Sequence, residues 1–428
     1  MRDHRTLCAA LCTSKGAAET IHSAVGGLAP VKLHLRFHDL TIEHLKPPAD
    51  WLARHGRALV GNVTVEDETL HSYTGDSDSD SENDASVILH EADRDFCSHV
   101  RAWLVQPRAL EIVHCANVEL LGAFSLSRLT QLVLSLEEPC DGYGVRNVAQ
   151  VMAALAPLTG LQYLSVSSPE RWSGCEAALA PLTRLTRLWL ISDVMCDGSE
   201  SMQRMPLPWA LLQTLPASLQ SLHVIANVEP GATLTHLTAL TFLALSPLRP
   251  LQLAALPCSV QHLEMDYLAL LFHASLTHLT ALTTLNLTNL EFQDQPDTRS
   301  PALSLPASLE ELRVAKIVTG ISLPLLQHAT KLTALELGID AHHLAQLSAV
   351  LAPLTCLAVL RLDAGSYPPG PLPNDEQTAE LGMVLSRLPL RQLSLPTFDA
   401  WQVGAYQAWN TVLLQHCSPH VRESLMMW

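Results

Sequence analysis

The chain has 428 residues, a formal net charge of -16, and 48% hydrophobic but only 5% aromatic residues. One compact core seldom grows to this length, so several domains or a repeat array are expected. Leucine alone accounts for 81 residues, which predicts a core of stacked leucines. An acidic chain with five lysines and no basic run is repelled by phosphate backbones, so we expect no nucleic-acid partner.

The first hundred residues predict short elements in chain order. Residues 4–26 have apolar positions at helical spacing and end at Gly26-Gly27. Residues 31–38 and 60–65 alternate as strands do, and Pro47-Pro48 introduces a helix over 49–57. We therefore expect a helical region over residues 1–27 and degenerate repeats over residues 28–115.

A low-complexity acidic serine run interrupts this region. Residues 72–86 contain the sequence DSDSDSEND, which cannot bury apolar surface and is expected to be a disordered insert. Ser77, Ser79 and Ser81 each precede an acidic residue by three positions, as acidophilic serine kinases prefer. Two interpretations stay open: a solvated loop that is never modified, or three phosphorylation sites.

The phrase L-x-x-L-x-L is repeated from here to residue 395. Successive copies lie 19 to 34 residues apart, and they begin at Leu110, Leu129, Leu161, Leu185, Leu219, Leu240, Val260, Leu282, Leu309, Leu332, Leu357 and Leu390. We expect regular repeats over residues 116–395, each with a short strand whose leucines point inward. Long repeats leave room for a helix, as over 145–158, and short ones only for a turn or 3₁₀ segment. Residues 396–428 predict a helical cap, with an amphipathic helix over 398–415.

This phrase resembles the leucine-rich repeat superfamily over roughly residues 50–395. The resemblance implies an α/β solenoid with a curved parallel β-sheet on the concave face and helices and 3₁₀ or turn segments on the convex face. Residues 215–222 and 305–312 look like units of bacterial secreted ubiquitin ligases, but only 33 residues follow Leu395, too few for the catalytic domain of such enzymes.

Residues 3–25 look like the latter half of an F-box leading into repeats. That resemblance implies a Skp-type adaptor as partner and a role as substrate-recognition subunit of a cullin-type (SCF) ubiquitin ligase. The other interpretation of residues 1–27 is a plain N-terminal cap of the solenoid.

Motifs for catalysis are absent from the sequence, so we expect no enzyme, no cofactor and no metal. The twenty histidines mostly occupy recurring turn positions and are interpreted as structural. Ten cysteines without a C-x-x-C pair indicate a reducing compartment. Because we find neither a signal h-region nor a long apolar stretch, we expect no membrane segment and a cytoplasmic location, with the nucleus as the alternative.

The residues between the strand leucines are expected to face outward from the concave sheet. Aromatic and charged side chains in one band would suit a protein partner, and the candidates are Tyr163, Arg187, Trp189, His223, Ile225, Phe242, His262, Glu264 and Asp266. Glu311, Arg313, Glu336, Arg361 and Asp363 would continue the band with charges that set specificity. The function predicted is a non-enzymatic protein-binding module. In the alternative, these residues pack on each other or on a loop and contact no ligand.

Overall fold

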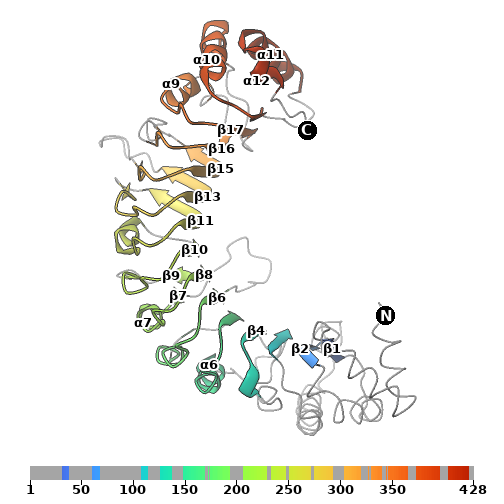
Figure 1. Cartoon of the computed structure of the whole chain (residues 1–428), viewed down its shortest axis with the longest axis vertical. Coiled ribbons are helices and arrows are strands. Elements are labelled where there is room, and N and C mark those ends of the chain that lie inside the picture. The colour runs from blue at the N-terminus through green and yellow to red at the C-terminus, as the bar shows by residue number, and fades with distance from the viewer. Residues whose placement is uncertain are drawn as a thin grey trace, which may run out of the picture. The chain divides into compact units, whose positions relative to one another are not determined.

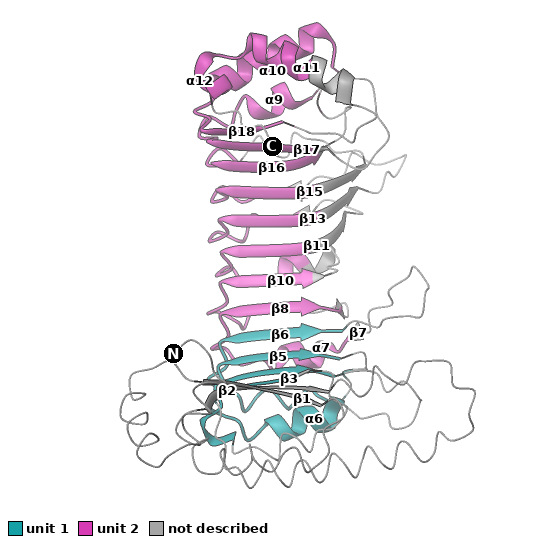
Figure 2. Cartoon of the chain, turned by 90° about the vertical axis from the view of Figure 1, so that its right-hand side faces the viewer, with its two compact units in different colours: residues 1–205 teal, residues 206–428 magenta. Residues whose placement is uncertain are grey.

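The computed structural model describes residues 31–37, 60–67, 108–113, 126–136, 148–168, 172, 174–192, 206–228, 233–246, 250–270, 274–292, 303–319, 326, 329–339, 344, 346–364, 373–395 and 403–423. The chain divides into two compact units, unit 1 (Met1–Met205) and unit 2 (Pro206–Trp428), coloured separately in Figure 2. Each unit is described by itself.

The described strands of unit 1 are all parallel and pair side by side in chain order. They are β1 (Val31–Phe37), β2 (Val60–Asp67), β3 (Ala109–Val113), β4 (Gln131–Ser135), β5 (Tyr163–Ser167) and β6 (Arg187–Ile191). The 3₁₀ helix η2 (Leu126–Arg128) precedes β4, and α6 (Val148–Leu155) precedes β5. The first two strands and α6 lie where the sequence predicts them.

Unit 2 continues the same plan with parallel neighbours in chain order. Its main strands are β8 (Ser221–Ile225), β10 (Phe242–Ser246), β11 (His262–Leu270), β13 (Thr284–Phe292), β15 (Glu311–Thr319), β16 (Ala334–Ile339), β17 (Val359–Ala364) and β18 (Gln392–Ser394). Two short pairs accompany them: β7 (Pro206–Leu207) with β9 (Asn227–Val228), and β12 (Ala274–Ser275) with β14 (Leu303–Ser304).

The described helices of unit 2 lie in the connections between strands and after the last strand. They are α7 (Trp209–Gln213), η3 (Pro250–Ala255), α9 (Leu347–Leu351), α10 (Asp375–Arg387), α11 (Val403–His416) and α12 (Pro419–Glu423). In Figure 1 the main strands of this unit lie on one side of the stacked repeats, and α7 and α9 lie on the other. The described part of the short connection before β11 contains the 3₁₀ helix η3, as the length of the connection predicts.

The repeated leucines explain why each strand forms where it does. In the copy that begins at Leu282, the side chains of Leu282, Leu285 and Leu287 are all fully buried. The inward leucines of neighbouring strands lie in register, so that Leu285 pairs with Leu263 on one side and Leu312 on the other. Stacking these rows removes apolar surface from water along the whole unit, which is the main favourable term in folding. The predicted fold class, a leucine-rich repeat solenoid, is confirmed.

One predicted repeat is out of register. The sequence pattern places the start of a copy at Leu110, yet Leu110 pairs with Leu132 and Ile112 with Leu134. Leu110 is therefore the second leucine of its phrase, and Pro107 occupies the place of the first. The prediction was wrong by three residues because a proline in the first position hides the pattern.

Two turn sequences alternate ahead of the main strands of unit 2 from β8 to β16. The sequence L-P-x-S begins at Leu215, Leu256 and Leu305, before β8, β11 and β15, whereas L-x-H begins at Leu234, Leu276 and Leu326, before β10, β13 and β16. In L-P-x-S turns, the amide of the first apolar residue of the L-x-x-L-x-L phrase donates to the proline carbonyl, at 3.1 to 3.2 Å. From β8 to β16 the repeating unit thus consists of two turns, one of each kind.

A threonine hydroxyl marks the same alternation in both units. From β3 to β16, in every second repeat a threonine follows the first leucine of the L-x-x-L-x-L phrase, and its Oγ1 donates to a main-chain carbonyl of the preceding repeat. The bonds join Thr130 to Arg108 (3.1 Å), Thr186 to Gln162 (3.0 Å), Thr241 to Gln220 (3.2 Å), Thr283 to Gln261 (3.2 Å) and Thr333 to Glu310 (3.1 Å). The strands therefore form threonine-linked pairs: β3 with β4, β5 with β6, β8 with β10, β11 with β13, and β15 with β16.

The C-terminal end of the chain packs three helices together. The helix expected over residues 398–415 is α11, but α10 was not predicted, and α11 packs against it. The indole Nε1 of Trp409 donates to Oγ1 of Thr378 at 3.1 Å, between two buried side chains. Asn374 caps α10 through reciprocal bonds with Gln377, at 2.9 and 3.0 Å.

Candidate protein-binding surface

The face of each sheet turned away from the buried leucines carries the candidate binding residues. On β6, Leu188 and Leu190 are fully buried, whereas the alternating Arg187 and Trp189 are exposed. This alternation is the geometry of a strand with one face in the core. The predicted binding residues divide between the units: three lie in unit 1 and six in unit 2.

In unit 1 the three residues come together on two neighbouring strands. Tyr163 of β5 pairs in register with Arg187 of β6, and Ser165 pairs with Trp189. The Tyr163 and Trp189 rings meet edge to face, with centroids 6.3 Å apart and planes at 76°. Trp189 remains 38% exposed, although most large apolar side chains of the sheet are buried.

In unit 2 the outward residues form two rows across β8, β10, β11 and β13. The first row is Ser221, Phe242, His262 and Thr284, and the second is His223, Ala244, Glu264 and Asn286. His262 is exposed, whereas Phe242, His223, Ile225 and Glu264 are half-buried. The side chain of Asp266 lies outside the described residues.

Two residues expected to face outward are covered instead. Ser165 in unit 1 is only 7% exposed, and Ala244 in unit 2 only 4%. Both are small and stand beside longer side chains on the neighbouring strand: Trp189 next to Ser165, and Glu264 next to Ala244. Alternation predicts the face on which a side chain stands, but the size of its neighbours decides how much of it water reaches.

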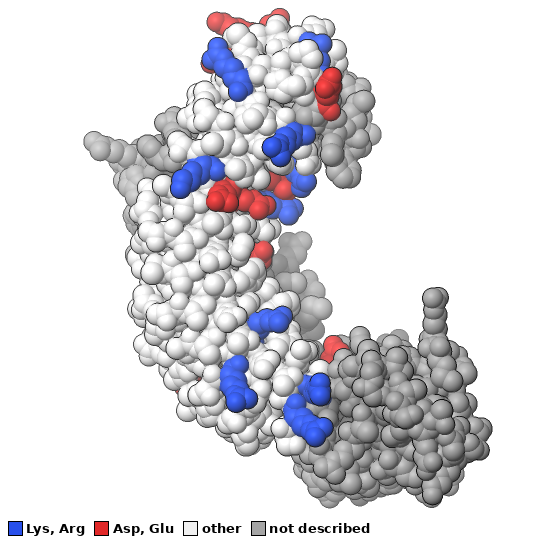
Figure 3. All heavy atoms as spheres, viewed as in Figure 1, with Lys and Arg blue, Asp and Glu red and all other residues white. Residues whose placement is uncertain are grey.

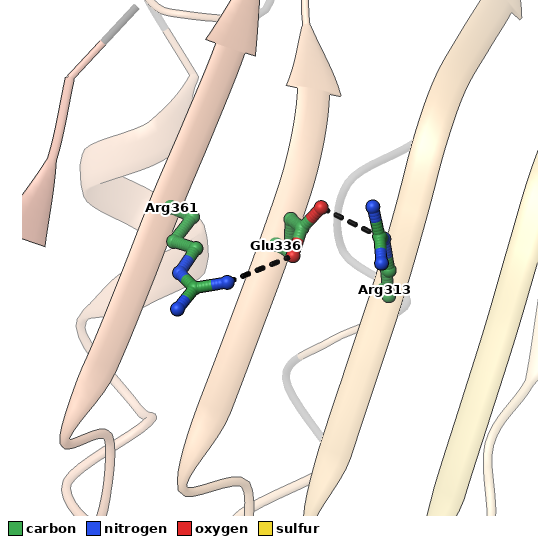
Figure 4. A network of polar contacts seen from close by, with 3 residues as sticks. All are labelled: Arg313, Glu336 and Arg361. Carbon is green, nitrogen blue, oxygen red and sulfur yellow. Dashed lines mark ion pairs between the residues drawn. The ribbon is translucent and has the colours of Figure 1, made fainter. Parts of the chain in front are cut away.

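The charged continuation of the band is an ion-pair network within unit 2. Glu336 of β16 stands between two arginines, with Oε1 2.7 Å from Arg313 Nε of β15 and Oε2 3.7 Å from Arg361 Nη1 of β17 (Figure 4). With the Gln392 amide oriented so that its oxygen faces Arg361, that oxygen accepts from Nη2 at 3.0 Å and Nε at 3.1 Å. The arginine side chains are 53% and 46% exposed, whereas that of Glu336 is 15% exposed. The Glu336 carboxylate thus bridges two arginines across three strands.

The structure adds a set of basic residues that the sequence analysis missed. Arg108, Arg128 and Arg184 are exposed in the turns that precede β3, β4 and β6. They lie far apart in the chain and form no basic run, so only the stacking of repeats brings them to one edge. A search for charges at equivalent repeat positions would have found Arg128 and Arg184, because each directly precedes a leading leucine.

Several predicted features lie outside the described residues. These are the acidic insert with Ser77, Ser79 and Ser81, and residues 1–27 with the resemblance to an F-box. The Skp-type adaptor and the ubiquitin-ligase role therefore stay predictions. Over the residues that the structure does describe, no cluster of three or more His, Cys, Asp or Glu side chains could hold a metal ion. None of the described helices has the length and apolar character needed to cross a membrane.

Comparison with known proteins gives a likeness in structure only. No protein-family model matches the sequence, and no curated protein matches it. Among solved structures, the chain is similar to an internalin, InlF, from Listeria monocytogenes, with 12% identity and a TM-score of 0.36, over 90% of this chain and 95% of the internalin. It is also similar to a chain in the Toll–Spätzle complex of Drosophila, with 14% identity and a TM-score of 0.38, over 87% of this chain and 51% of that one. At these scores the fold assignment rests on the strand order and register of the chain itself.

Proposed function

We propose that this chain is a non-enzymatic protein-binding module, and that a protein partner docks on the outward sheet face of unit 1 around Tyr163, Arg187 and Trp189. The exposed Trp189 ring, packed edge to face on the half-buried Tyr163, is the observation that carries this proposal. Tryptophan, tyrosine and arginine are the residues most enriched at binding hot spots, where they fill pockets of a partner.

The edge-to-face contact also prepares Trp189 for binding. A ring held by its neighbour loses little conformational freedom when a partner covers it, so less of the interaction energy is offset by ordering. In this packing Trp189 remains 38% exposed. A partner that covered this remainder would remove apolar surface from water at about 25 cal/mol per Å².

The test compares two truncations of exposed apolar side chains. Trp189 and Met383 are the large hydrophobic residues that stand exposed among the described part of the chain, at 38% and 52%. Proteins captured from a lysate by the tagged wild-type chain are identified, and the capture is repeated with Trp189→Ala and with Met383→Ala. We expect Trp189→Ala to lose a partner that Met383→Ala and the wild type retain, with an unfolding temperature close to that of the wild type.

Two results would contradict the proposal. If Trp189→Ala captures every partner as the wild type does, the exposed ring has no role in binding. If Trp189→Ala unfolds as readily as the core variant Leu188→Ala, whose truncation should cost about 2–5 kcal/mol, the ring serves packing alone.

A further inference from the structure

The basic side chains that the structure describes in unit 1 lie at the edge where β3, β4 and β6 begin. Arg108 directly precedes β3, Arg128 ends η2 ahead of β4, Arg184 lies three residues before β6, and Arg187 is the first residue of β6. All four side chains are exposed. Figure 3 shows Lys and Arg side chains over the described part of unit 1 on this side. We name Arg108, Arg128, Arg184 and Arg187 the arginine edge.

Main-chain hydrogen bonds fix the spacing of these turns. The carbonyl of Arg108 accepts from the amide of Thr130 at 2.8 Å, the carbonyl of Thr130 accepts from Gln162 at 2.8 Å, and the carbonyl of Gln162 accepts from Thr186 at 2.9 Å. Neighbouring strands lie about 4.8 Å apart, so the arginine edge spans three spacings, or about 14 Å. An extended peptide covers that length with about four or five residues, at roughly 3.3 Å per residue.

The arginine edge carries more positive than negative charge. The acidic side chains described over β3 to β6 and their turns are Glu111 and Glu176, against four arginines. Glu176 is half-buried, and its Oε1 accepts from the Gly174 amide at 3.2 Å. Across the described residues, none of the four guanidinium groups takes part in an ion pair. Guanidinium groups bind carboxylates through paired hydrogen bonds, so this edge suits an acidic ligand.

We propose that the arginine edge of unit 1 binds an acidic, Asp- and Glu-rich segment of a protein partner, laid extended across the turns before β3 to β6. This rests on the proposed function, because Arg187 also borders the Tyr163–Trp189 pair and one partner would contact both. A protein segment fits better than a nucleic acid. The chain as a whole carries a net charge of -16, which repels a polyphosphate at long range, whereas a short peptide brings few charges.

The probe is a fluorescein-labelled pentapeptide of alternating Asp and Glu, which matches the length of the arginine edge, and its binding to the full-length protein is measured by fluorescence anisotropy. Arg108→Gln, Arg128→Gln and Arg184→Gln are combined in one variant, which leaves Arg187 and the aromatic pair unchanged. We expect the wild type to bind the probe, the affinity to fall with added salt, and the triple variant to bind about tenfold more weakly. The matched control is Lys331→Gln with Arg391→Gln, which alters exposed cations at the same repeat positions in unit 2.

The results separate this proposal from the proposed function. If the triple variant binds the probe like the wild type, or the wild type does not bind it, the arginine edge is not an acidic-peptide site. Tighter binding of a five-nucleotide oligothymidylate than of the peptide would assign the edge to nucleic acid and overturn the proposal. If Trp189→Ala still captures every partner while the triple variant loses the probe, the proposed function fails and the arginine edge stands.

Discussion

Gly382 of α10 lies so close to His416 of α11 that a β-carbon on Gly382 would stand 2.6 Å from the His416 Cβ and 3.3 Å from the Leu413 carbonyl oxygen. Real β-carbons do not approach each other so closely. We expect Gly382→Ala to lower the free energy of unfolding by about 1–3 kcal/mol, because the two helices must separate. The steric cost outweighs the gain of about 1 kcal/mol that alanine brings to a helix.

Urea unfolding followed by circular dichroism measures this cost. Gly160→Ala is the matched control, since the nearest atom to its new β-carbon is the Leu129 carbonyl oxygen at an ordinary 3.6 Å. A Gly382→Ala midpoint at or above that of Gly160→Ala would show that the crossing of α10 and α11 is looser than described.

The threonine hydroxyl bonds predict a stability difference between two otherwise similar substitutions. Thr283→Val removes the bond from Oγ1 to the Gln261 carbonyl at 3.2 Å and keeps the branched shape of the side chain. We expect a loss of about 0.5–1.5 kcal/mol in the free energy of unfolding. Thr280→Val, at an exposed residue in the preceding turn, serves as the control and should cost less. Equal midpoints in denaturant would mean that the hydroxyl contributes nothing to the stacking.

The Arg313–Glu336–Arg361 network predicts a salt-dependent contribution. Glu336→Gln leaves two guanidinium groups on neighbouring strands without the carboxylate between them. Because both arginines are about half exposed, we expect a loss of only about 0.5–1 kcal/mol, which shrinks as sodium chloride is added. Glu311→Gln, at an exposed position on β15, is the comparison. A loss that is unchanged at high salt would contradict an electrostatic origin.

The described cysteines differ in burial, and we therefore expect their thiols to differ in reactivity. Burial, and secondarily the charge of Glu176, raises the pKa of Cys175 from 9.0 to about 12, and burial also raises the pKa of Cys417. Cys258 and Cys356 are exposed. Since the thiolate is the reactive form, we expect a thiol reagent at pH 8 to label Cys258 and Cys356 in the native protein, and Cys175 and Cys417 only after unfolding. Site-resolved mass spectrometry measures the order, and fast native labelling of Cys175 would contradict it.

The raised pKa of Cys175 makes the free energy of unfolding depend on pH. The folded state holds the Cys175 proton more tightly than the unfolded state, so its contribution is complete below pH 9 and is lost as the pH rises towards 12. Cys175→Ala should therefore flatten the fall in unfolding free energy over that window, compared with Cys356→Ala. If Cys175→Ala leaves the fall in unfolding free energy unchanged, Cys175 is not the source of that pH dependence.

The strands could be predicted from the sequence because the spacing of the leucines indicates where each strand lies and which of its faces is buried. The error at Leu110 arose where a proline replaced the leading leucine. Helix α10 was missed, although Asn374 and Gln377 at its start form a capping box that is readable from the sequence. The burial of Ser165 could not be predicted, because it depends on Trp189 in the next repeat. The arginine edge was hidden for a similar reason, since its members become neighbours only after the turns stack.

The threonine-linked pairs have a consequence for the deletion of repeats from the chain. Removing the single repeat of β13 would bring the L-P-x-S turns before β11 and β15 together, with no threonine hydroxyl to join them. Removing β11 and β13 together would place an L-P-x-S turn after an L-x-H turn, as everywhere else from β8 to β16. From β8 to β16 two successive repeats therefore form one structural unit, and only the removal of such a pair would preserve the alternation of the two turns.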